Sequence, residues 1–374
     1  MVTQGRNLQL LAVKLSTIAV CFCLFVYWVV AVFNKKMIIF NGTFNGRFKQ
    51  NLATNLNLIN YNDIYMDKNN SSKFNTSMSD VMVYLNIQKT GSTTFNTHLV
   101  MDIDLEKPCV CKPNKCTGSG SGVCQTWKVG QCQCMRPGNP GKTWLFSRPT
   151  TGWWCGIHAD WTELTSCVDR YFDVKEEKSE RRYFYLTLLR DPVERFISEF
   201  KHIQHGAVWG RDMEKHVCNG RQPLPKELPK CHTGPNWRIA QIEEFMDCSS
   251  NLAINRQTRM LANLELVNCY NTTSMERGER NRIMLQSAKE NLLQMAFFGL
   301  TEMQAESQYI FEQTFNLKFK NNFSQKQSSY AKTLLNDTIS DSVVQTIEEL
   351  NHLDMELYNF AKKVFLQRFE EISM

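Results

Sequence analysis

The segment "NIQKTGSTTF" (residues 86–95) decides how the rest of this sequence is interpreted. It follows the apolar run Val81–Leu85, so the pattern predicts a strand, a tight turn and the start of a helix. A helix that begins at such a turn directs backbone N–H groups and the positive end of its dipole toward the turn. Lys89 adds a full positive charge, and hydroxyl donors follow at Ser92, Thr93 and Thr94. The segment is therefore predicted to bind phosphate or sulfate.

The spacing of this turn distinguishes it from the common nucleotide-binding loop. In the Walker A pattern the lysine directly follows the second glycine, whereas here Lys89 precedes the only glycine, Gly91. A nucleotide kinase or a GTPase is therefore not expected. Taken alone, the turn is equally compatible with an ordinary strand-to-helix connection that a serine or threonine hydroxyl caps.

The overall composition is that of a globular protein with a weak positive charge. The 374 residues are 43% hydrophobic and carry a formal net charge of +6, which allows a substantial core and suits an acidic partner. No basic tract or known nucleic-acid-reading motif accompanies this charge, so nucleic acid is not expected as a partner.

The N-terminal region predicts attachment to a membrane. Residues 15–33, "LSTIAVCFCLFVYWVVAVF", are uncharged and long enough to span a bilayer. We predict a short cytoplasmic tail at 1–14, an uncleaved transmembrane anchor at 15–33, a flexible luminal stem at 34–79 and a catalytic domain at 80–374. A cleaved secretory signal is the alternative to the anchor. Seven N-glycosylation sequons and twelve of the fourteen cysteines follow residue 33, which favours a luminal body.

A cysteine-rich insert occupies about residues 108–140 and is predicted to be loop rather than core. Its cysteines allow two interpretations, disulfides or a zinc cluster. The spacing is C-x-C instead of the C-x2-C of common zinc modules, so disulfides are favoured for Cys109, Cys111, Cys116, Cys132 and Cys134.

A second strand-to-helix junction lies near the middle of the chain. Tyr183–Leu189 has the apolar, aromatic-rich composition of a buried parallel strand, and it ends at Arg190. Asp191 can cap a helix that has Pro192 as its first residue, and Ser198 falls about two turns further along. Ligands of open α/β sheets bind at the carboxyl ends of the strands. The junctions at Lys89 and Arg190 could therefore hold opposite ends of one nucleotide.

The second half of the sequence is predicted to be mainly helical. Apolar spacing indicates one further strand, and the last helix is expected to run unbroken with a stripe of apolar residues toward the core. The predicted elements are helices at 251–264, 280–295, 301–315 and 341–369 and a strand at 296–300.

The segment 143–164 carries the residues best suited to carbohydrate chemistry. It contains four tryptophans (Trp144, Trp153, Trp154 and Trp161) and Arg148, side chains that suit sugar stacking and sulfate contacts. Its single histidine, His158, could remove a proton from a hydroxyl near neutral pH. The alternative is a buried structural histidine beside a disulfide at Cys155.

Six segments in continuous order from about residue 81 to residue 369 closely resemble the heparan sulfate 6-O-sulfotransferases. They are "IQKTGSTTF", "TWLFSRPTTGWWCGIHADWTEL", "LTLLRDPVERFISEF", "EFMDC", "NRQTRMLA" and "MAFFGLTE". The resemblance implies a P-loop-like α/β sulfotransferase fold with a central parallel sheet flanked by helices, a disulfide-rich insert and a helical C-terminal half. It also implies a Golgi type II membrane enzyme that uses 3'-phosphoadenosine 5'-phosphosulfate, requires no metal and sulfates the 6-hydroxyl of glucosamine in heparan sulfate chains.

The resemblance also implies roles for individual residues. His158 would be the catalytic base, and Lys89 would stabilise the leaving oxygen. By residue type alone, His202 and His205 compete with His158 as bases, and only the resemblance ranks His158 first. Donor contacts are expected from Asn86, Ile87, Gln88, Lys89, Thr90, Gly91, Ser92, Thr93 and Thr94, from Arg190 and Ser198 at the 3'-phosphate, and from Ser329 and Tyr330. Acceptor contacts are expected from Arg148, Trp153, His202 and Trp209.

Three departures from the family pattern keep other functions open. The family usually has glycine where Ser92 stands and a lysine pair before the C-x-C that matches Cys132 and Cys134, and Tyr330 cannot replace the charge of a family arginine. A catalytically weak protein that binds sulfated glycans is therefore one alternative. A sulfotransferase for another acceptor, such as chondroitin or protein tyrosine, is another.

Overall fold

The computed structural model describes residues 60–66, 73–113, 129–205, 216–229, 231, 240–323 and 339–374. The predicted anchor at 15–33 lies outside these residues, as do Trp209, Ser329 and Tyr330. None of the helices in the described part of the chain is long and apolar enough to cross a bilayer.

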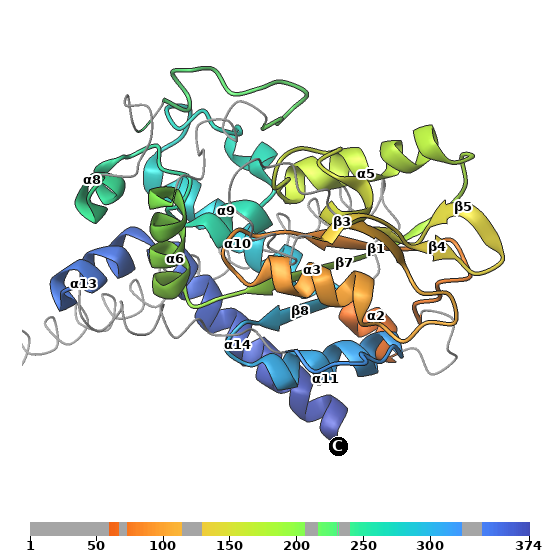
Figure 1. The fold of residues 1–374 in the computed structure, drawn as a ribbon. Helices are drawn as coiled ribbons and strands as arrows, with labels where there is room; N and C mark the ends of the chain where they lie inside the picture. The colour runs from red at the N-terminus through yellow and green to blue at the C-terminus, as the bar shows by residue number, and fades with distance from the viewer. Residues whose placement is uncertain are drawn as a thin grey trace, which may run out of the picture. The chain divides into compact units, whose positions relative to one another are not determined.

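A sheet of four parallel strands forms the centre of the fold, in the order β6-β1-β7-β8 (Figure 1). In the longest pairing, β1 and β7 run side by side from Asp80 opposite Arg182 to Leu85 opposite Thr187. Both strands are buried on both faces, which explains their continuous apolar sequences. The predicted parallel α/β sheet is therefore confirmed. The strands are β1 (Asp80–Leu85), β6 (Leu145–Phe146), β7 (Arg182–Leu189) and β8 (Phe297–Leu300).

One face of the sheet is covered by α3 (Ser92–Met101) and α11 (Gln304–Phe315). The ring of Phe95 in α3 stacks on Phe297 of β8 with 6.1 Å between ring centroids, and Phe311 of α11 meets Phe297 edge-on at 5.3 Å. These aromatic contacts fix α3, and with it the loop that precedes α3, against the sheet.

The opposite face is covered by α5 (Trp161–Lys175) and α14 (His352–Ser373). The ring of Trp161 lies 5.1 Å from that of Tyr185 in β7, and Phe365 of α14 lies 6.3 Å from Phe298 of β8. Since Phe297 and Phe298 are successive residues of a strand, they point to opposite faces, and each face receives its own helix pair.

The remaining helices surround these layers. In Figure 1, α6 and α13 lie together beyond the carboxyl ends of the strands, and they share a buried cluster with α8 that includes Phe196, Phe200 and Phe245. The bounds are α2 (Tyr61–Met66), α4 (Arg148–Thr151), α6 (Pro192–Gln204), α8 (Ile242–Asp247), α9 (Arg256–Leu261), a 3-10 turn at Leu264–Val267, α10 (Arg277–Gln294) and α13 (Asp341–Leu350).

The cysteine-rich insert is more ordered than predicted. It forms two antiparallel hairpins, β2 (Val110–Pro113) with β3 (Val129–Gln133) and β4 (Met135–Arg136) with β5 (Asn139–Thr143). The expectation of loop outside the core was wrong for Cys132 and Cys134, which are buried. One disulfide joins Cys111 of β2 to Cys132 of β3, and a second joins Cys109 to Cys134 just outside these strands. These bonds occupy the cysteine sulfurs that a zinc site would need. Cys116 lies outside the described residues.

Two predicted helices differ from the structure. The single helix at 341–369 is broken at Asn351 into α13 and α14, because Asn255 inserts there and donates its side-chain amide to the carbonyl of Leu350. The helix predicted at 251–264 is shorter, and α9 begins only at Arg256 because Asn255 adopts a left-handed backbone with φ of 47°. A tertiary contact between distant segments decides both boundaries.

The packed part of the chain begins before Asp80, within the segment assigned to the stem. Phe74 is buried and lies edge-on to Phe184 of β7 at 5.1 Å and to Phe315 of α11 at 5.8 Å. Tyr61 of α2 is also buried, with the guanidinium of Arg368 4.3 Å from its ring centroid.

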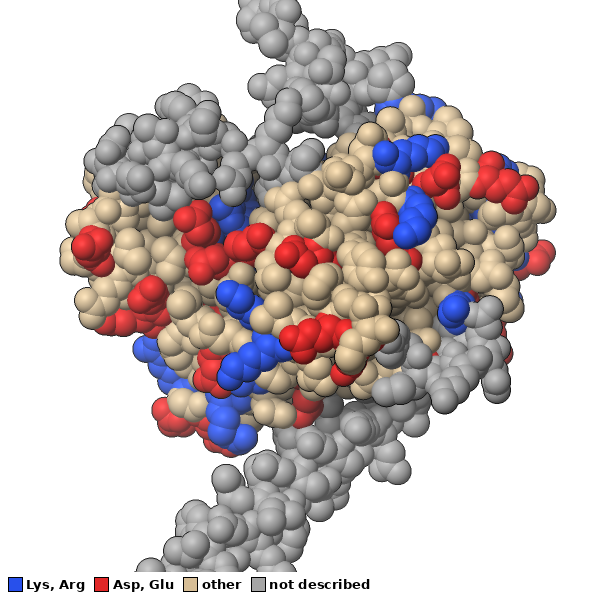
Figure 2. Space-filling model, turned by 90° about the horizontal axis from the view of Figure 1, so that it is seen from below, with Lys and Arg blue, Asp and Glu red and all other residues tan. Residues whose placement is uncertain are grey.

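The face seen in Figure 2 carries acidic and basic side chains interspersed, with no gathering of basic groups into one patch. The described residues on this face therefore do not form a broad basic patch that would attract a polyanion.

We expect Gly299→Ala to destabilise the fold. A Cβ at Gly299 would lie 2.7 Å from Cδ2 of Leu188 in β7 and 3.0 Å from Oγ of Ser307 in α11, so these two buried side chains would have to move within a packed region. Overpacking of this kind costs about 1–3 kcal/mol, which urea unfolding would measure.

Gly278→Ala is the matched control. The new Cβ would meet only the carboxylate of Glu276, at 2.9 Å, which caps α10. A weaker cap and the higher helix propensity of alanine act in opposite directions, so the free energy of unfolding should change little. Equal stability of the two variants would contradict the close approach of β7, β8 and α11.

Candidate functional site

The loop between β1 and α3 is closed by hydrogen bonds to a single carbonyl. The hydroxyls of Thr90 and Ser92 both donate to the carbonyl oxygen of Ile87, at 3.0 Å and 2.6 Å. Ser92 is buried, and its hydroxyl points into the loop. Serine in place of the usual family glycine therefore adds an internal bond to the loop.

Two non-glycine residues at this site have a strained backbone. Lys89 has a φ of 68° and His158 a φ of 52°, both in the left-handed region, which is uncommon for non-glycine residues, although Asn, Asp and His adopt it more often than the others. Four of the seven non-glycine residues with positive φ in the described part of the chain are asparagines, which tolerate it. Such strain costs about 1–3 kcal/mol per residue and concentrates at functional sites.

The two strand-to-helix junctions meet at this loop. Arg190 follows β7, and its Nη1 donates to the carbonyl oxygen of Lys89 at 3.2 Å. The hydroxyl of Thr301, just after β8, donates to the carbonyl of Thr90 at 2.8 Å and to that of Leu189 at 2.9 Å as alternative acceptors. The carboxyl ends of three neighbouring strands are thus tied together, as expected for Lys89 and Arg190.

His158 lies against the beginning of the same loop. Its Nδ1 is 3.4 Å from the carbonyl oxygen of Asn86, so the tautomer that carries the proton on Nδ1 donates there and leaves Nε2 as an acceptor. Burial, followed by the positive charge of Arg256, lowers the pKa of His158 to about 3. The imidazole is therefore neutral near pH 7.

An aromatic and cationic surface adjoins this imidazole. The ring of Trp153 lies 4.7 Å from that of His158, and the guanidinium of Arg148 lies 4.9 Å from the Trp153 ring centroid. Arg148 and Trp153 are both exposed. The sequence-predicted acceptor residues of this segment therefore sit beside the predicted base.

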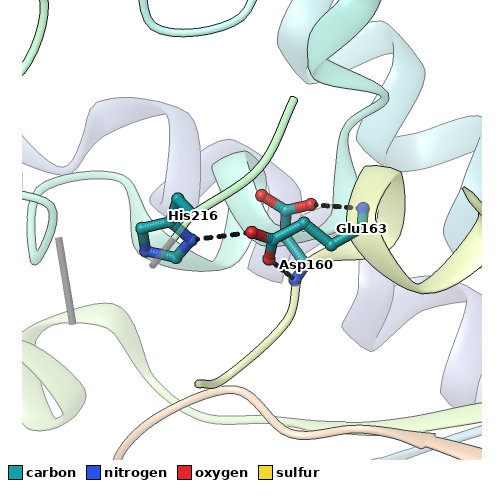
Figure 3. Close-up of side chains that lie close together, drawn as sticks. All are labelled: Asp160, Glu163 and His216. Atoms are coloured by element: carbon teal, nitrogen blue, oxygen red, sulfur yellow. Dashed lines mark hydrogen bonds and ion pairs between the residues drawn. The ribbon is translucent and has the colours of Figure 1, made fainter. Parts of the chain in front are cut away.

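A buried capping arrangement fixes α5 immediately after His158 (Figure 3). The backbone N–H of Glu163 donates to Asp160 at 3.0 Å, and that of Asp160 donates to Glu163 at 2.9 Å. Glu163 also accepts from the backbone of Val217 at 2.8 Å and lies 3.1 Å from Nδ1 of His216. The cap thereby anchors the distant segment at 216 and 217 next to the predicted base.

Asp160, Glu163 and His216 are also a possible set of metal ligands, because their donor atoms lie within 4.8 Å of one another. The cap bonds already use both oxygens of Glu163, and the positive charge of Arg259 faces both acids. Both features oppose a cation, so we interpret the group as a structural cap, and the expectation that no metal is needed stays a prediction.

Sequence reasoning missed a buried charge cluster below the loop. Glu199 of α6 is fully buried and pairs with Arg195 and with Arg256 of α9. Arg256 also donates to the side-chain oxygen of Gln88 in the loop at 3.0 Å. Arg256 falls inside the quoted segment "NRQTRMLA", but spacing along the sequence gives no sign of a contact with residue 88.

A pocket opens beside the loop, between α3 and the residues that follow β8. Its accessible lining is mainly apolar, although hydroxyl and amide side chains are among the lining residues. The lining residues are Gly91, Thr94, Phe95, His98, Leu188, Leu300, Thr301, Gln304, Ser307 and Phe323.

The other predicted site residues form no hydrogen bond with the loop in the described part of the chain, or lie outside the described residues. The side chain of His202 reaches solvent near the end of α6. Its pKa is lowered by partial desolvation from the surrounding protein and then by the charge of Lys89, which puts it in the same electrostatic neighbourhood. Ser198 is half-buried on α6, and His205 is exposed at the end of that helix. The roles assigned to Trp209, Ser329 and Tyr330 concern residues outside those that the structure describes.

Comparisons with known proteins show which family this chain resembles. A model described as "Sulfotransferase family" matches residues 72–361. The chain is 50% identical over 300 residues to heparan-sulfate 6-O-sulfotransferase 2 of Gallus gallus, covering 79% of this chain and 70% of that protein. It is 52% identical over 300 residues to heparan-sulfate 6-O-sulfotransferase 3 of Mus musculus, covering 79% and 60%. It is 48% identical over 303 residues to heparan-sulfate 6-O-sulfotransferase 1 of Homo sapiens, covering 80% and 69%.

We expect Asp160→Asn to change how stability depends on pH. Burial, and then the charge of Glu163, raises the pKa of Asp160 to about 7. The folded protein therefore holds a proton between about pH 4 and pH 7 that the unfolded chain has lost, so this group loses stabilising effect as the pH rises through that range. Asparagine keeps the cap acceptor but does not titrate.

Urea unfolding at pH 5 and pH 8 measures the effect. The free energy of unfolding of the Asp160→Asn variant, minus that of the wild type, should rise by at least about 1.4 kcal/mol from pH 5 to pH 8, the equivalent of one pKa unit. The lowered pKa of His158 acts in the opposite direction in both proteins and cancels in the comparison. A constant difference would show that Asp160 titrates normally.

Proposed function

Because the chain belongs to the heparan-sulfate 6-O-sulfotransferase family, we propose that it transfers a sulfuryl group to the 6-hydroxyl of glucosamine units in heparan sulfate. The donor is 3'-phosphoadenosine 5'-phosphosulfate. The observation that carries the proposal is the meeting of two cationic strand ends, at Lys89 and Arg190, with a neutral imidazole, that of His158, around one anion-binding loop.

The loop and its surroundings suit each part of the donor. Residues 86–94 surround the phosphosulfate, with the N-terminus of α3 directed at it. Arg190 and Ser198 take the 3'-phosphate at the end of β7 and on α6. The pocket beside Gly91 and Thr301 takes the adenosine, because it adjoins the loop and its accessible lining is mainly apolar.

The residues at the loop supply what sulfuryl transfer requires. The acceptor oxygen attacks sulfur while the bond from sulfur to the 5'-phosphate oxygen breaks, and the electron pair of that bond passes to the phosphate oxygen. Lys89 stabilises the charge on this leaving oxygen. The proton of the hydroxyl passes to Nε2 of His158, and the carbonyl of Asn86 holds the ring in the necessary tautomer.

The low pKa of His158 fits a base that becomes effective only when the donor binds. A polyanionic donor brings negative charge next to a ring that burial, and then the positive charges of Arg256 and Arg148, otherwise keep neutral. Its arrival raises the pKa of His158 toward the range in which a base works efficiently. The ring therefore becomes a competent base when the donor is in place.

The acceptor is proposed to lie across the exposed pair Arg148 and Trp153, with His202 and Trp209 as further contacts. Trp153 offers a face for a sugar ring, and Arg148 offers a bidentate partner for sulfate or carboxylate. Ser92 bonds inside the loop, so the departure at this position gives no reason to prefer a glycan-binding protein without activity.

We further propose that the protein is a single-pass type II membrane protein of the Golgi, anchored by residues 15–33. The sequons Asn75 and Asn322 are exposed and Asn271 is half-buried, so these three are accessible for glycosylation in a lumen. The five disulfides among the described residues also fit an oxidising compartment.

Transfer of radiolabelled sulfate from the donor to desulfated heparan, followed by disaccharide analysis, tests the reaction and the acceptor together. The label should appear at the 6-hydroxyl of glucosamine. Label at another position or on another acceptor would reject the assignment. Glycan binding without transfer would favour the non-catalytic alternative.

The substitution His158→Asn tests the base. Asparagine tolerates the left-handed backbone at this position, so the loop should keep its shape while the base is lost. We expect kcat to fall by about 10²- to 10⁴-fold, with the affinity for 3'-phosphoadenosine 5'-phosphate unchanged.

His205→Asn is the control for this substitution, because His205 is exposed at the end of α6. It should retain the wild-type rate. If His205→Asn lost activity and His158→Asn retained it, the base would have to be reassigned.

A further inference from the structure

Glu199 is an acidic group enclosed by cationic residues beneath the site. Its side chain is completely buried, and it is paired by Arg195 on its own helix and by Arg256 of α9. Arg256 binds both of its oxygens, with Nη2 2.5 Å from Oε1 and Nε donating to Oε2 at 3.1 Å. A carboxylate buried this deeply is held in one place by its partners.

Arg256 extends this pair to the donor loop. Its remaining terminal nitrogen, Nη1, donates to Oε1 of Gln88 at 3.0 Å. Gln88 is buried and directly precedes Lys89, whose left-handed backbone needs support from its surroundings. A planar guanidinium thus joins α6, α9 and the loop through rigid geometry.

The pair also acts on the two predicted catalytic groups. Burial lowers the pKa of Lys89, as do the charges of Arg190 and Arg195, and Glu199 is the acidic group that opposes them. On the other side, Arg256 adds to burial in lowering the pKa of His158, together with Arg148 and His216. The carboxylate favours a charged Lys89, and the guanidinium favours a neutral His158.

We propose that the buried ion pair of Glu199 and Arg256 positions the Lys89 side chain for the reaction, through the hydrogen bond from Arg256 to Gln88. Neither residue touches the substrates. The proposal rests on the function proposed above, because it assigns these residues to the reaction carried out at the same loop.

The substitution Gln88→Met tests the link directly. Methionine has a similar volume but cannot accept from Arg256, and Arg256 stays paired with Glu199, so no buried charge is left alone. We expect the thermal midpoint to fall by only a few degrees, because one buried N–H of Arg256 loses its acceptor. The KM for the donor should stay close to wild type while kcat falls about tenfold or more, because small misplacements of reacting groups cost up to about 10²-fold. Unchanged kcat, or a fall in thermal midpoint that accounts for the lost activity, would overturn the proposal.

Arg256→Lys and the double variant Gln88→Met/Arg256→Lys test whether the two residues act as one unit. Lysine keeps a positive charge but cannot bind both oxygens of Glu199 and reach Gln88 as well. The double variant should lose no more activity than the worse single variant. Losses in kcat that multiply would mean independent effects and would contradict the link.

Glu199→Gln tests the effect of the carboxylate charge through the pH dependence of kcat/KM, which a purely structural role of Glu199 would leave unchanged. Removing the negative charge should lower the pKa of Lys89 further, so the loss of kcat/KM at alkaline pH should shift to lower pH. An alkaline limb at the same pH in both proteins, or seen in neither, would count against the charge effect. If this variant does not fold, Gln88→Met and the double variant decide the case.

Gln286→Met is the matched control, since Gln286 is exposed on α10 and, within the described part of the chain, its side chain bonds only to Glu290 of the same helix. It should behave as wild type. The wild-type protein is assayed first, because absence of sulfuryl transfer there would reject the proposed function and this proposal with it. Transfer that is insensitive to Gln88→Met would reject the positioning role alone.

Discussion

The parallel pairing of β1 and β7 is the constraint on which the site depends. Because the strands run in the same direction and in register from Asp80 opposite Arg182 onward, both end at the same edge of the sheet. Lys89 and Arg190, 101 residues apart, therefore meet through a hydrogen bond to a loop carbonyl. An antiparallel arrangement would place the two cations at opposite edges, and no single nucleotide could reach both.

The unfavourable backbone conformations at the site are held in place by hydrogen bonds and contacts with surrounding residues. The left-handed conformations of Lys89 and His158 are unfavourable in isolation, and each is held by neighbours on both sides. For Lys89 these are the hydroxyl bonds to Ile87 and the contact of Gln88 with Arg256. For His158 they are the contact with Asn86 and the cap formed by Asp160 and Glu163. The loop is thus organised before any ligand arrives, which is the usual requirement for electrostatic stabilisation of a transition state.

An acidic residue near the site favours a protonated Lys89, and basic residues favour a neutral His158. A collection of arginines alone would favour loss of the proton from Lys89 as well as from His158. Glu199 lies where it supports the charge of Lys89, whereas Arg256 is the charge that bears most on His158. One buried ion pair can therefore favour opposite protonation states in two groups that serve the same reaction.

The sequence by itself determined the parts that depend on local pattern. Apolar runs predicted β1, β7 and β8, the Asp191 and Pro192 pair predicted the start of α6, and C-x-C spacing favoured disulfides over zinc. The motifs identified the family and drew attention to Lys89, His158 and Arg190. Only the tertiary structure decided the break at Asn351, the late start of α9, the order within the insert, and the cluster of Glu199, Arg256 and Gln88. The physical reason is that each of these is created by a contact between segments far apart along the chain, where residue spacing carries no information about distance.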